Sequence, residues 1–203
     1  MARRRARPGR IGPNAVIRLA EALEGEDDPT VARRVFARAG QAGYLTSPPT
    51  HMIPAADYSA LCRALFAELD GPRAHRIARH SGELTGDYLL SRRIPAAFQA
   101  LLRRLPTPLA ARALAVAISG HAWTFIGDGA FAWRGVSGGL SLVLTGSPAC
   151  RGLHAAAPVC DAFAATFGRI FSGALGRPVV AAEVACAAMG ERACRFEVRW
   201  REG

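Results

Sequence analysis

The pattern of apolar residues changes character about two thirds of the way along the chain, and this change leaves few possible folds. From Tyr58 to Leu69, apolar side chains recur at helical spacing, as on a helix with one buried face. From Cys194 to Trp200, apolar and charged residues alternate, which is typical of a half-buried antiparallel strand. A helical first half followed by strands predicts an α+β fold, with a small antiparallel sheet packed on helices.

Cap, turn and breaker residues divide the chain into elements. The loop at 46–54 contains three prolines, and the glycine-rich run at 135–139 is expected to join two short strands. A turn at 189–192 joins the last two strands. The expected helices span 14–23, 29–38, 58–69, 73–90, 95–105, 107–125 and 158–175, and the first two strands span 130–133 and 140–144.

The composition is that of a chain that folds in a reducing compartment. Its 203 residues, half of them hydrophobic, suit one domain with a sizeable core. No apolar run of about 18 residues lacks charges or breakers, so no transmembrane helix is expected. Pro8 and Gly9 follow the arginine-rich start where a signal peptide would have an apolar segment. We therefore expect a cytoplasmic protein whose five cysteines bind metal or lie buried.

The basic charge carries less information than its size suggests. The net charge is +10, but half of the excess lies in the first ten residues and the rest is scattered along the predicted helices. This distribution favours a disordered tail and solvated helix faces over a nucleic-acid surface. A weak tether to an anionic partner or a membrane surface is the alternative. All 26 basic residues are arginine, which excludes a lysine Schiff base and a P-loop lysine.

Four residues in the last third have the types and spacing of a zinc site: Cys160, Glu183, Cys186 and Cys194. Zinc favours cysteine-rich tetrahedral sites in which a carboxylate can be the fourth ligand. Cys160 falls on the apolar face of its predicted helix, and Cys194 shares the inward face of its strand with Phe196. Glu183 and Cys186 are three residues apart, so a regular strand would point them to opposite faces. A bulge or an early strand end is therefore required.

The alternative for these cysteines is that they are small buried apolar residues. Spacing alone leaves the two readings even. Cys62 lies within the apolar stripe of a helix and is expected to pack in the core. Cys150 lies in a predicted loop and has no evident partner.

The end of the chain, EVACAAMGERACRFEV, resembles the end of the 4-vinyl reductase domain, which binds small molecules. That family ends in an acidic residue, a cysteine, a glycine, and a second cysteine followed by a basic residue and phenylalanine. Some phenol-sensing transcription activators carry this domain with a zinc site of three cysteines and a glutamate. The resemblance implies the same roles, one by one, for the four residues named above, and it favours a structural zinc site over simple burial.

Three further segments resemble the J-protein family of bacteriochlorophyll biosynthesis, which is often called 4-vinyl reductase. They are IGPNAVIRLAEAL at 11–23, TGDYLLSRRIP at 85–95 and HAWTFIGDG at 121–129. The resemblance covers nearly the whole chain and implies a purple phototrophic bacterium. It implies a magnesium tetrapyrrole ligand of the Mg-protoporphyrin or protochlorophyllide type. It also implies a fold like that of trafficking-complex subunits, which commonly dimerise.

Three regions follow from these patterns. Residues 1–12 are expected to be a disordered basic tail, 13–106 a helical region, and 107–203 a ligand-binding domain of the 4-vinyl reductase type with the zinc site. The apolar helix at 14–23 has more apolar surface than a small sheet can cover, so a homodimer is expected. A peripheral position at the photosynthetic membrane would be compatible with the cytoplasmic placement.

The resemblance leaves an enzyme, a carrier and a regulator as possibilities. Reduction of a vinyl group needs electrons from a nicotinamide, a flavin or an iron–sulfur cluster. No G-x-G-x-x-G motif lies between a predicted strand and helix, and a zinc ion closed by four protein ligands does no redox chemistry. We therefore favour a protein that carries or presents the tetrapyrrole, with magnesium chelatase or the following methyltransferase as suitable partners. The alternatives are an 8-vinyl reductase of divinyl protochlorophyllide and a tetrapyrrole-sensing regulator.

Candidate contacts to the pigment come from two segments. The apolar stretch at 113–131 offers a lining for a flat ligand, and His121 within it could be the axial ligand of magnesium. A hydrogen bond at a helix end is the alternative role of His121. Arg92 and Arg93 could pair with carboxylates at the pigment edge, or be solvated surface residues. The apolar candidates are Ile118, Trp123 and Phe125.

Overall fold

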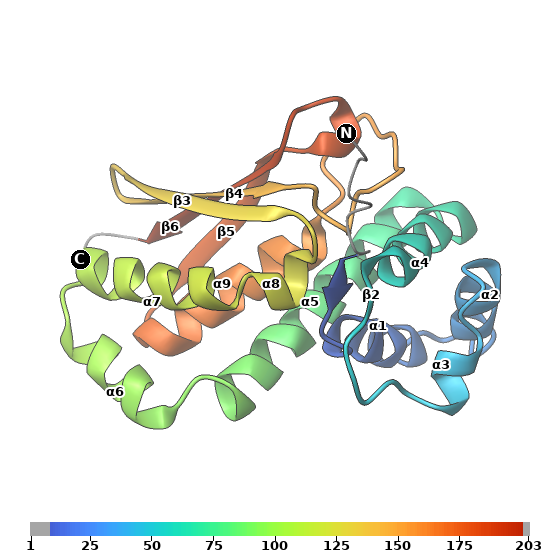
Figure 1. Ribbon diagram of the computed structural model, residues 1–203, viewed down its shortest axis with the longest axis horizontal. Helices are drawn as coiled ribbons and strands as arrows, with labels where there is room; N and C mark the ends of the chain where they lie inside the picture. The colour runs from blue at the N-terminus through green and yellow to red at the C-terminus, as the bar shows by residue number, and fades with distance from the viewer. Residues whose placement is uncertain (1–8, 201–203) are drawn as a thin grey trace, which may run out of the picture.

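The C-terminal half of the chain builds a four-stranded antiparallel sheet that helices cover on one face (Figure 1). The computed structural model describes residues 9–200. The order of strands in the sheet is β3-β4-β6-β5, and this arrangement confirms the α+β class expected from the sequence. The strands are β3 (Ala130–Val136), β4 (Gly139–Thr145), β5 (Val179–Ala185) and β6 (Cys194–Trp200).

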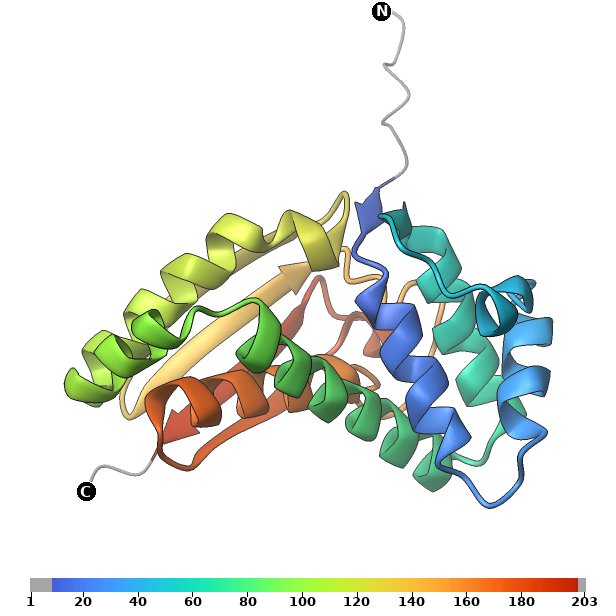
Figure 2. The ribbon, with the colours of Figure 1, turned by 90° about the horizontal axis from the view of Figure 1, so that it is seen from below.

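Helices form the rest of the fold. Figure 2 shows α1 to α4 gathered at one end of the molecule, the sheet with α7 and α9 at the other, and the long helix α5 between them. The expected helix at 107–125 is divided, since α7 ends at His121 and α8 follows after Ala122. The helices are α1 (Asn14–Glu24), α2 (Val31–Arg38), α3 (Gly43–Thr46), α4 (Ala55–Glu68), α5 (Gly71–Arg92), α6 (Ala96–Arg104), α7 (Thr107–His121), α8 (Trp123–Ile126), α9 (Asp161–Leu175) and a short 3-10 helix (Ala187–Met189).

Ordered structure begins earlier than the sequence suggested. Of the predicted disordered tail, residues 1–8 lie outside the described residues. Arg10–Ile11 forms the short strand β1, which pairs with β2 (Ile53–Pro54), and Ile11 is fully buried. The prediction of disorder is therefore wrong for Arg10 and Ile11, because a paired strand and a buried isoleucine stabilise this segment. The predicted loop at 46–54 accordingly ends in β2.

The inner face of the sheet carries the core of the C-terminal half. In β6, the side chains of Cys194, Phe196, Val198 and Trp200 are buried, as the alternation in the sequence predicted. Phe196 is opposite Leu142 of β4 and packs against Phe167 of α9. A shift in register lies between Glu183 and Ala185, and β5 ends at Ala185. The expected bulge and the early strand end are therefore both present.

The two expected regions share one hydrophobic core. Helix α5, from the helical region, packs along α9, from the region that contains the sheet. Two buried glycines of α5, Gly82 and Gly86, lie against α9, and the hydroxyl of Thr166 donates a hydrogen bond of 3.0 Å to the carbonyl of Gly82. Small residues at the crossing let the two helix backbones approach closely.

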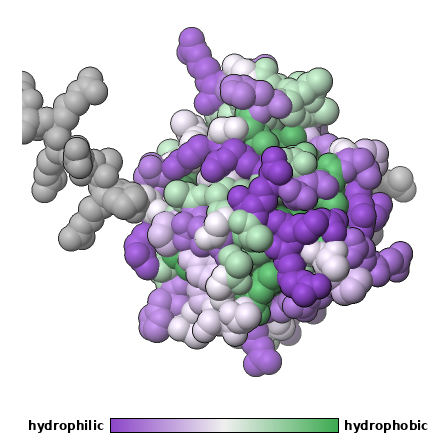
Figure 3. Space-filling model, turned by 90° about the vertical axis from the view of Figure 1, so that its right-hand side faces the viewer, coloured by the Kyte–Doolittle hydropathy of each residue, from purple (hydrophilic) through white to green (hydrophobic). Residues whose placement is uncertain are grey.

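The surface at the N-terminal end is mainly hydrophilic, with apolar patches between the charged side chains (Figure 3). Arg34 and Arg38 of α2 pair there with Glu68 of α4. The apolar surface of α1, which together with the family resemblance led to the expectation of a dimer, is largely covered within the chain, because Val16 and Leu19 are buried. Among residues 9–200, no helix combines the length and apolar composition needed to cross a bilayer.

Candidate functional site

Four cysteine thiols lie close together at the end of the sheet where β5 is joined to β6. They belong to Cys150, Cys160, Cys186 and Cys194, and all four side chains are at most 4% exposed. Each Sγ lies within 4.8 Å of the other three. The sequence predicted three of these cysteines as ligands, and the structure brings those three together.

The spacing of the thiols suits one metal ion. The Sγ atom of Cys194 lies 3.4 Å from that of Cys150, 3.6 Å from that of Cys160 and 3.9 Å from that of Cys186. Four ligands about 2.3 Å from a tetrahedral zinc ion are separated by about 3.8 Å, which follows from the Zn–S distance. An iron–sulfur cluster would need more widely separated cysteines, because its own iron and sulfide atoms lie between them. The four thiols therefore fit a single tetrahedral ion.

Three separate segments deliver the four cysteines. Cys150 lies in the connection between β4 and α9, and Cys160 is the residue that precedes the first turn of α9. Cys186 follows β5, and Cys194 is the first residue of β6. Only tertiary packing brings these segments together. The Ser59 hydroxyl of α4 anchors the connection by a 2.8 Å hydrogen bond to the carbonyl of Pro148.

Backbone donors and neighbouring thiols favour negative charge in the cluster. The amide of Ala187 donates a hydrogen bond to the sulfur of Cys194 at 3.5 Å. Hydrogen bonds from Cys160, Cys186 and Cys194 lower the pKa of the Cys150 thiol, whereas the hydrogen bond with Cys150 is the main cause that raises the pKa of Cys160. These contacts favour the thiolate at Cys150 and the protonated thiol at Cys160.

Glu183 lies beside the cluster and contacts its backbone. Its Oε2 accepts a 2.8 Å hydrogen bond from the amide of Cys160, at the N-terminus of α9. Its Oε1 is buried and has no hydrogen-bond partner among the described residues. Burial raises the pKa of the Glu183 carboxyl to about 7. The four thiols already suffice for a tetrahedral site, so Glu183 is a fifth candidate ligand.

The remaining cysteines differ from expectation in one case. Cys62 is buried in α4 beside Tyr58, and burial raises the pKa of its thiol to about 12, so it is a protonated core residue as predicted. Cys150, for which the sequence offered no partner, is in contact with Cys194. The available signal was the distribution of cysteines, since four of the five lie between Cys150 and Cys194. Burial, spacing and number together make this cluster a candidate metal centre.

The three N-terminal motifs also converge. The motif at 85–95 lies in α5, which packs along α1, where the motif at 11–23 lies. The amide of Gly12 donates a hydrogen bond of 2.6 Å to the carbonyl of Thr124, which belongs to the motif at 121–129. Segments that lie far apart in the sequence therefore meet around the start of α1.

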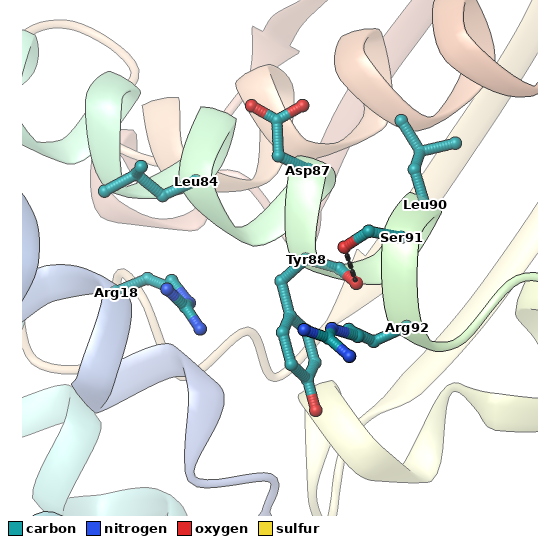
Figure 4. Close-up of a pocket in the computed structure, with 7 residues that line it drawn as sticks. All are labelled: Arg18, Leu84, Asp87, Tyr88, Leu90, Ser91 and Arg92. Atoms are coloured by element: carbon teal, nitrogen blue, oxygen red, sulfur yellow. Dashed lines mark hydrogen bonds between the residues drawn. The ribbon is translucent and has the colours of Figure 1, made fainter.

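An open groove of about 600 Å³ lies between α1 and the second half of α5 (Figure 4). Arg18 reaches from α1 toward α5, with its guanidinium carbon 5.1 Å from the centre of the Tyr88 ring. The side-chain amide nitrogen of Asn14, which neighbours Arg18, is buried without a hydrogen-bond partner among the described residues. The lining residues are Arg18, Leu84, Asp87, Tyr88, Leu90, Ser91 and Arg92.

Of the predicted pigment contacts, only Arg92 lines this groove. Arg93 donates a 3.1 Å hydrogen bond to the hydroxyl of Tyr88. His121 is exposed, and its Nδ1 is 2.9 Å from the carbonyl of Ala117, which is the helix-end hydrogen bond considered as the alternative. Trp123 is 60% exposed, so it does not line a closed slot.

The other two apolar candidates are half-buried. Phe125 joins an aromatic cluster with Phe131, Phe163 and Phe167, and Ile118 packs against the core. The groove residues Arg18 and Tyr88 were not identified from the sequence, although both lie in the motifs that carried the family resemblance.

Comparison with known proteins identifies the family. The V4R domain family matches residues 140–200, from β4 to β6. The bacteriochlorophyll synthase 23 kDa chain of Cereibacter sphaeroides is 42% identical over 190 residues, which cover 93% of this chain and 90% of the relative. The chain belongs to the family of bacteriochlorophyll synthase 23 kDa chains. The 23 kDa chain of Rhodobacter capsulatus is 35% identical over 187 residues, covering 92% of this chain and 85% of that relative. A role in bacteriochlorophyll biosynthesis, as the motifs implied, is confirmed.

The fold of this family member also occurs outside the family. A mutant H-NOX protein from K. algicida in the Fe(II) unliganded state superposes with a TM-score of 0.61 and 12% sequence identity. The superposition covers 95% of this chain and 98% of the H-NOX chain. The likeness shows that the N-terminal helices and the C-terminal sheet occur together in one known fold.

Proposed function

We propose that this protein binds a magnesium tetrapyrrole intermediate of bacteriochlorophyll biosynthesis and carries or presents it to a pathway enzyme. The observation that carries the proposal is the groove between α1 and α5, which is lined mostly by residues of two of the motifs that carry the family resemblance. The third motif contacts the start of α1 through the hydrogen bond between Gly12 and Thr124, but none of its residues lines the groove. Spaces between packed helices are common sites for small molecules. Magnesium chelatase and the following methyltransferase remain suitable partners, and a homodimer remains an expectation.

The chemistry of the groove suits a flat apolar ligand with acidic groups at its edge. Leu84, Leu90 and the ring of Tyr88 offer apolar contacts for a macrocycle. Arg92 has no ion-pair partner among residues 9–200, and it can pair with a carboxylate in bidentate fashion. The groove is open to solvent, so a pigment bound there would keep part of its surface exposed.

His121 is the proposed axial ligand. The hydrogen bond from its Nδ1 to the carbonyl of Ala117 fixes the ring and leaves Nε2 as the acceptor nitrogen. Histidines that bind metals usually hold their second ring nitrogen in this way. His121 is three residues from Thr124, whose carbonyl contacts the start of α1. Because His121 is exposed, a pigment bound to it would lie on the protein surface and cover the imidazole ring.

The test of this function is a titration of the full chain with magnesium protoporphyrin. We expect micromolar or tighter binding, and a shifted and sharpened Soret band, because the pigment leaves water for an apolar surface. The His121→Ala variant should alter the spectrum of the bound pigment if His121 is the axial ligand. Incubation of a divinyl pathway intermediate with the protein and NADPH or reduced ferredoxin is expected to leave its vinyl groups unchanged. Conversion to the ethyl form would restore the reductase alternative, and no spectral change with any pathway intermediate would favour a regulator.

Replacement of Arg92 by alanine is expected to weaken pigment binding about tenfold or more. A hydrogen bond to a charged group contributes about 1.5–3 kcal/mol, and about 1.4 kcal/mol corresponds to a factor of ten in affinity. Arg33→Ala is the matched control, because Arg33 is an exposed arginine of α2 outside the groove. Equal affinities of the two variants would place the carboxylate contacts elsewhere.

A further inference from the structure

The loop between β4 and α9 contains a cysteine that lies outside the predicted zinc motif. Cys150 is ten residues before Cys160, and the C-terminal motif from Glu183 to Cys194 does not include it. In the fold, however, its Sγ lies 3.4 Å from that of Cys194, and the side chain is 4% exposed. The chain therefore has one thiol more than a site of three cysteines and a glutamate requires.

We propose that this chain holds one zinc ion through four thiolates, from Cys150, Cys160, Cys186 and Cys194, and that Glu183 positions Cys160 without binding the metal. The four Sγ atoms lie within 4.8 Å of one another, and the shortest separations are close to the edge of a tetrahedron around zinc. A fifth ligand from Glu183 would exceed the usual four-coordinate geometry of structural zinc. Such a site has no open position, so its role is structural.

The contacts of Glu183 explain why an acidic residue stands there. Its Oε2 accepts the amide hydrogen of Cys160, and a carboxylate is favourable near the N-terminus of α9. The hydrogen bond fixes the backbone that carries the Cys160 thiol. Residues that orient metal ligands in this way commonly lie in the second layer of a metal site. Glu183 is thus a positioning residue, and it is not among the residues whose ligand atoms all lie within 4.8 Å of one another.

Cys150 also gives the site a second attachment to the connection at 146–160, whose last residue is Cys160. With Cys150 as a ligand, the metal would hold the middle of this connection as well as its end against both arms of the β5–β6 hairpin. The same connection is held by α4 through the Ser59 hydroxyl and by the hairpin through the amide of Ala155, which donates to the carbonyl of Ala188 at 3.0 Å. A ligand set without Cys150 would leave a buried thiol 3.4 Å from a metal-bound sulfur.

The ligand set can be read directly from wild-type protein. Metal analysis of the full chain, purified without chelator, is expected to give about one zinc per chain. X-ray absorption at the zinc edge is expected to show four sulfur atoms at about 2.3 Å and no oxygen shell at about 2.0–2.2 Å. Three sulfurs with one oxygen, or a folded protein without metal, would overturn the proposal. This measurement needs no variant and does not depend on pigment binding.

Variants loaded with cobalt(II) provide a second measurement, since thiolate-to-cobalt absorption grows with the number of thiolate ligands. Cys150→Ser is expected to lose about a quarter of this absorption, as four thiolates become three, and to bind the metal more weakly. Glu183→Gln is expected to keep the full absorption and one metal per chain, because the amide oxygen still accepts from Cys160. Cys62→Ala is the control, as it removes a buried thiol outside the cluster. An unchanged Cys150→Ser spectrum, or a Glu183→Gln spectrum that loses tetrahedral character, would contradict the assignment.

Discussion

Removal of the metal by a chelator is expected to lower the free energy of unfolding of this protein by several kcal/mol. Structural zinc contributes its binding energy to folding, since the unfolded chain has no preformed site. In this chain the ion would join the connection at 146–160, which has no helix or strand of its own, to the β5–β6 hairpin. For a domain of about 200 residues, a loss of several kcal/mol lowers the melting temperature by roughly 10 °C.

Thermal unfolding of the metal-loaded and metal-stripped protein checks this expectation. Hydrogen exchange locates the effect, because protection should be lost first in the connection at 146–160 and in residues 186–194. Gel filtration of the stripped protein separates a loosened native fold from aggregation. Equal melting temperatures with and without metal would show that the cluster is held by packing alone.

Periodicity made most of the fold predictable. The strand β6 and the helix α9 each have an apolar repeat that fixes which side chains are buried, and the register of the sheet follows from this repeat. The bulge near Glu183 was also predictable, since two candidate ligands three residues apart cannot share a face of a regular strand. Local sequence patterns were enough to predict a helix or strand wherever its buried side chains form an unbroken row.

The sequence did not predict features that depend on tertiary contacts between irregular segments. Cys150 lies in a connection with no repeat, so no local pattern indicates that its thiol reaches Cys194. For His121, the end of α7 decides which way the ring points, and a shift of one residue turns a side chain by about 100°. Trp123 illustrates the same limit, because α8 begins after a break in the helix and presents the indole to solvent.

The proposed pigment groove is made of residues whose chemistry alone does not indicate a site. Arg18 and Tyr88 carry no catalytic or metal-binding signature, and each lies in an ordinary helical pattern. Their positions within two separate family motifs gave the only hint, and the packing of α1 on α5 gave the geometry. Sites made from helix surfaces of this kind become visible once the helices are assembled.

The replacement of Gly82 by alanine is expected to lower the free energy of unfolding by about 2 kcal/mol or more, because overpacking of a close contact typically costs about 1–3 kcal/mol. A Cβ at Gly82 would overlap the carbonyl oxygen of Ala162 and lie 2.8 Å from the Cβ of Ala165. Both atoms belong to the first turns of α9, so neither can move without shifting that helix away from α5. The displacement would also disturb Cys160, which precedes α9, and thus couple the helix crossing to the metal centre.

Two further glycines make this expectation a graded series. A Cβ at Gly86 would lie 2.5 Å from the Cβ of Arg169, which the backbone of α9 holds in place, so Gly86→Ala should also destabilise the protein. Its effect should be smaller than that of Gly82→Ala, because the nearest backbone atom of α9 is 3.5 Å away and not in overlap. Gly120 on α7 has no atom within 4 Å of an added Cβ, and alanine there is expected to stabilise the helix by about 0.5–1 kcal/mol. Denaturant unfolding of the three variants measures their free energies of unfolding and so gives the order of their stabilities. If Gly82→Ala were as stable as Gly120→Ala, α5 and α9 would not cross as closely as described, and the shared core of the two regions would have to be held by other contacts.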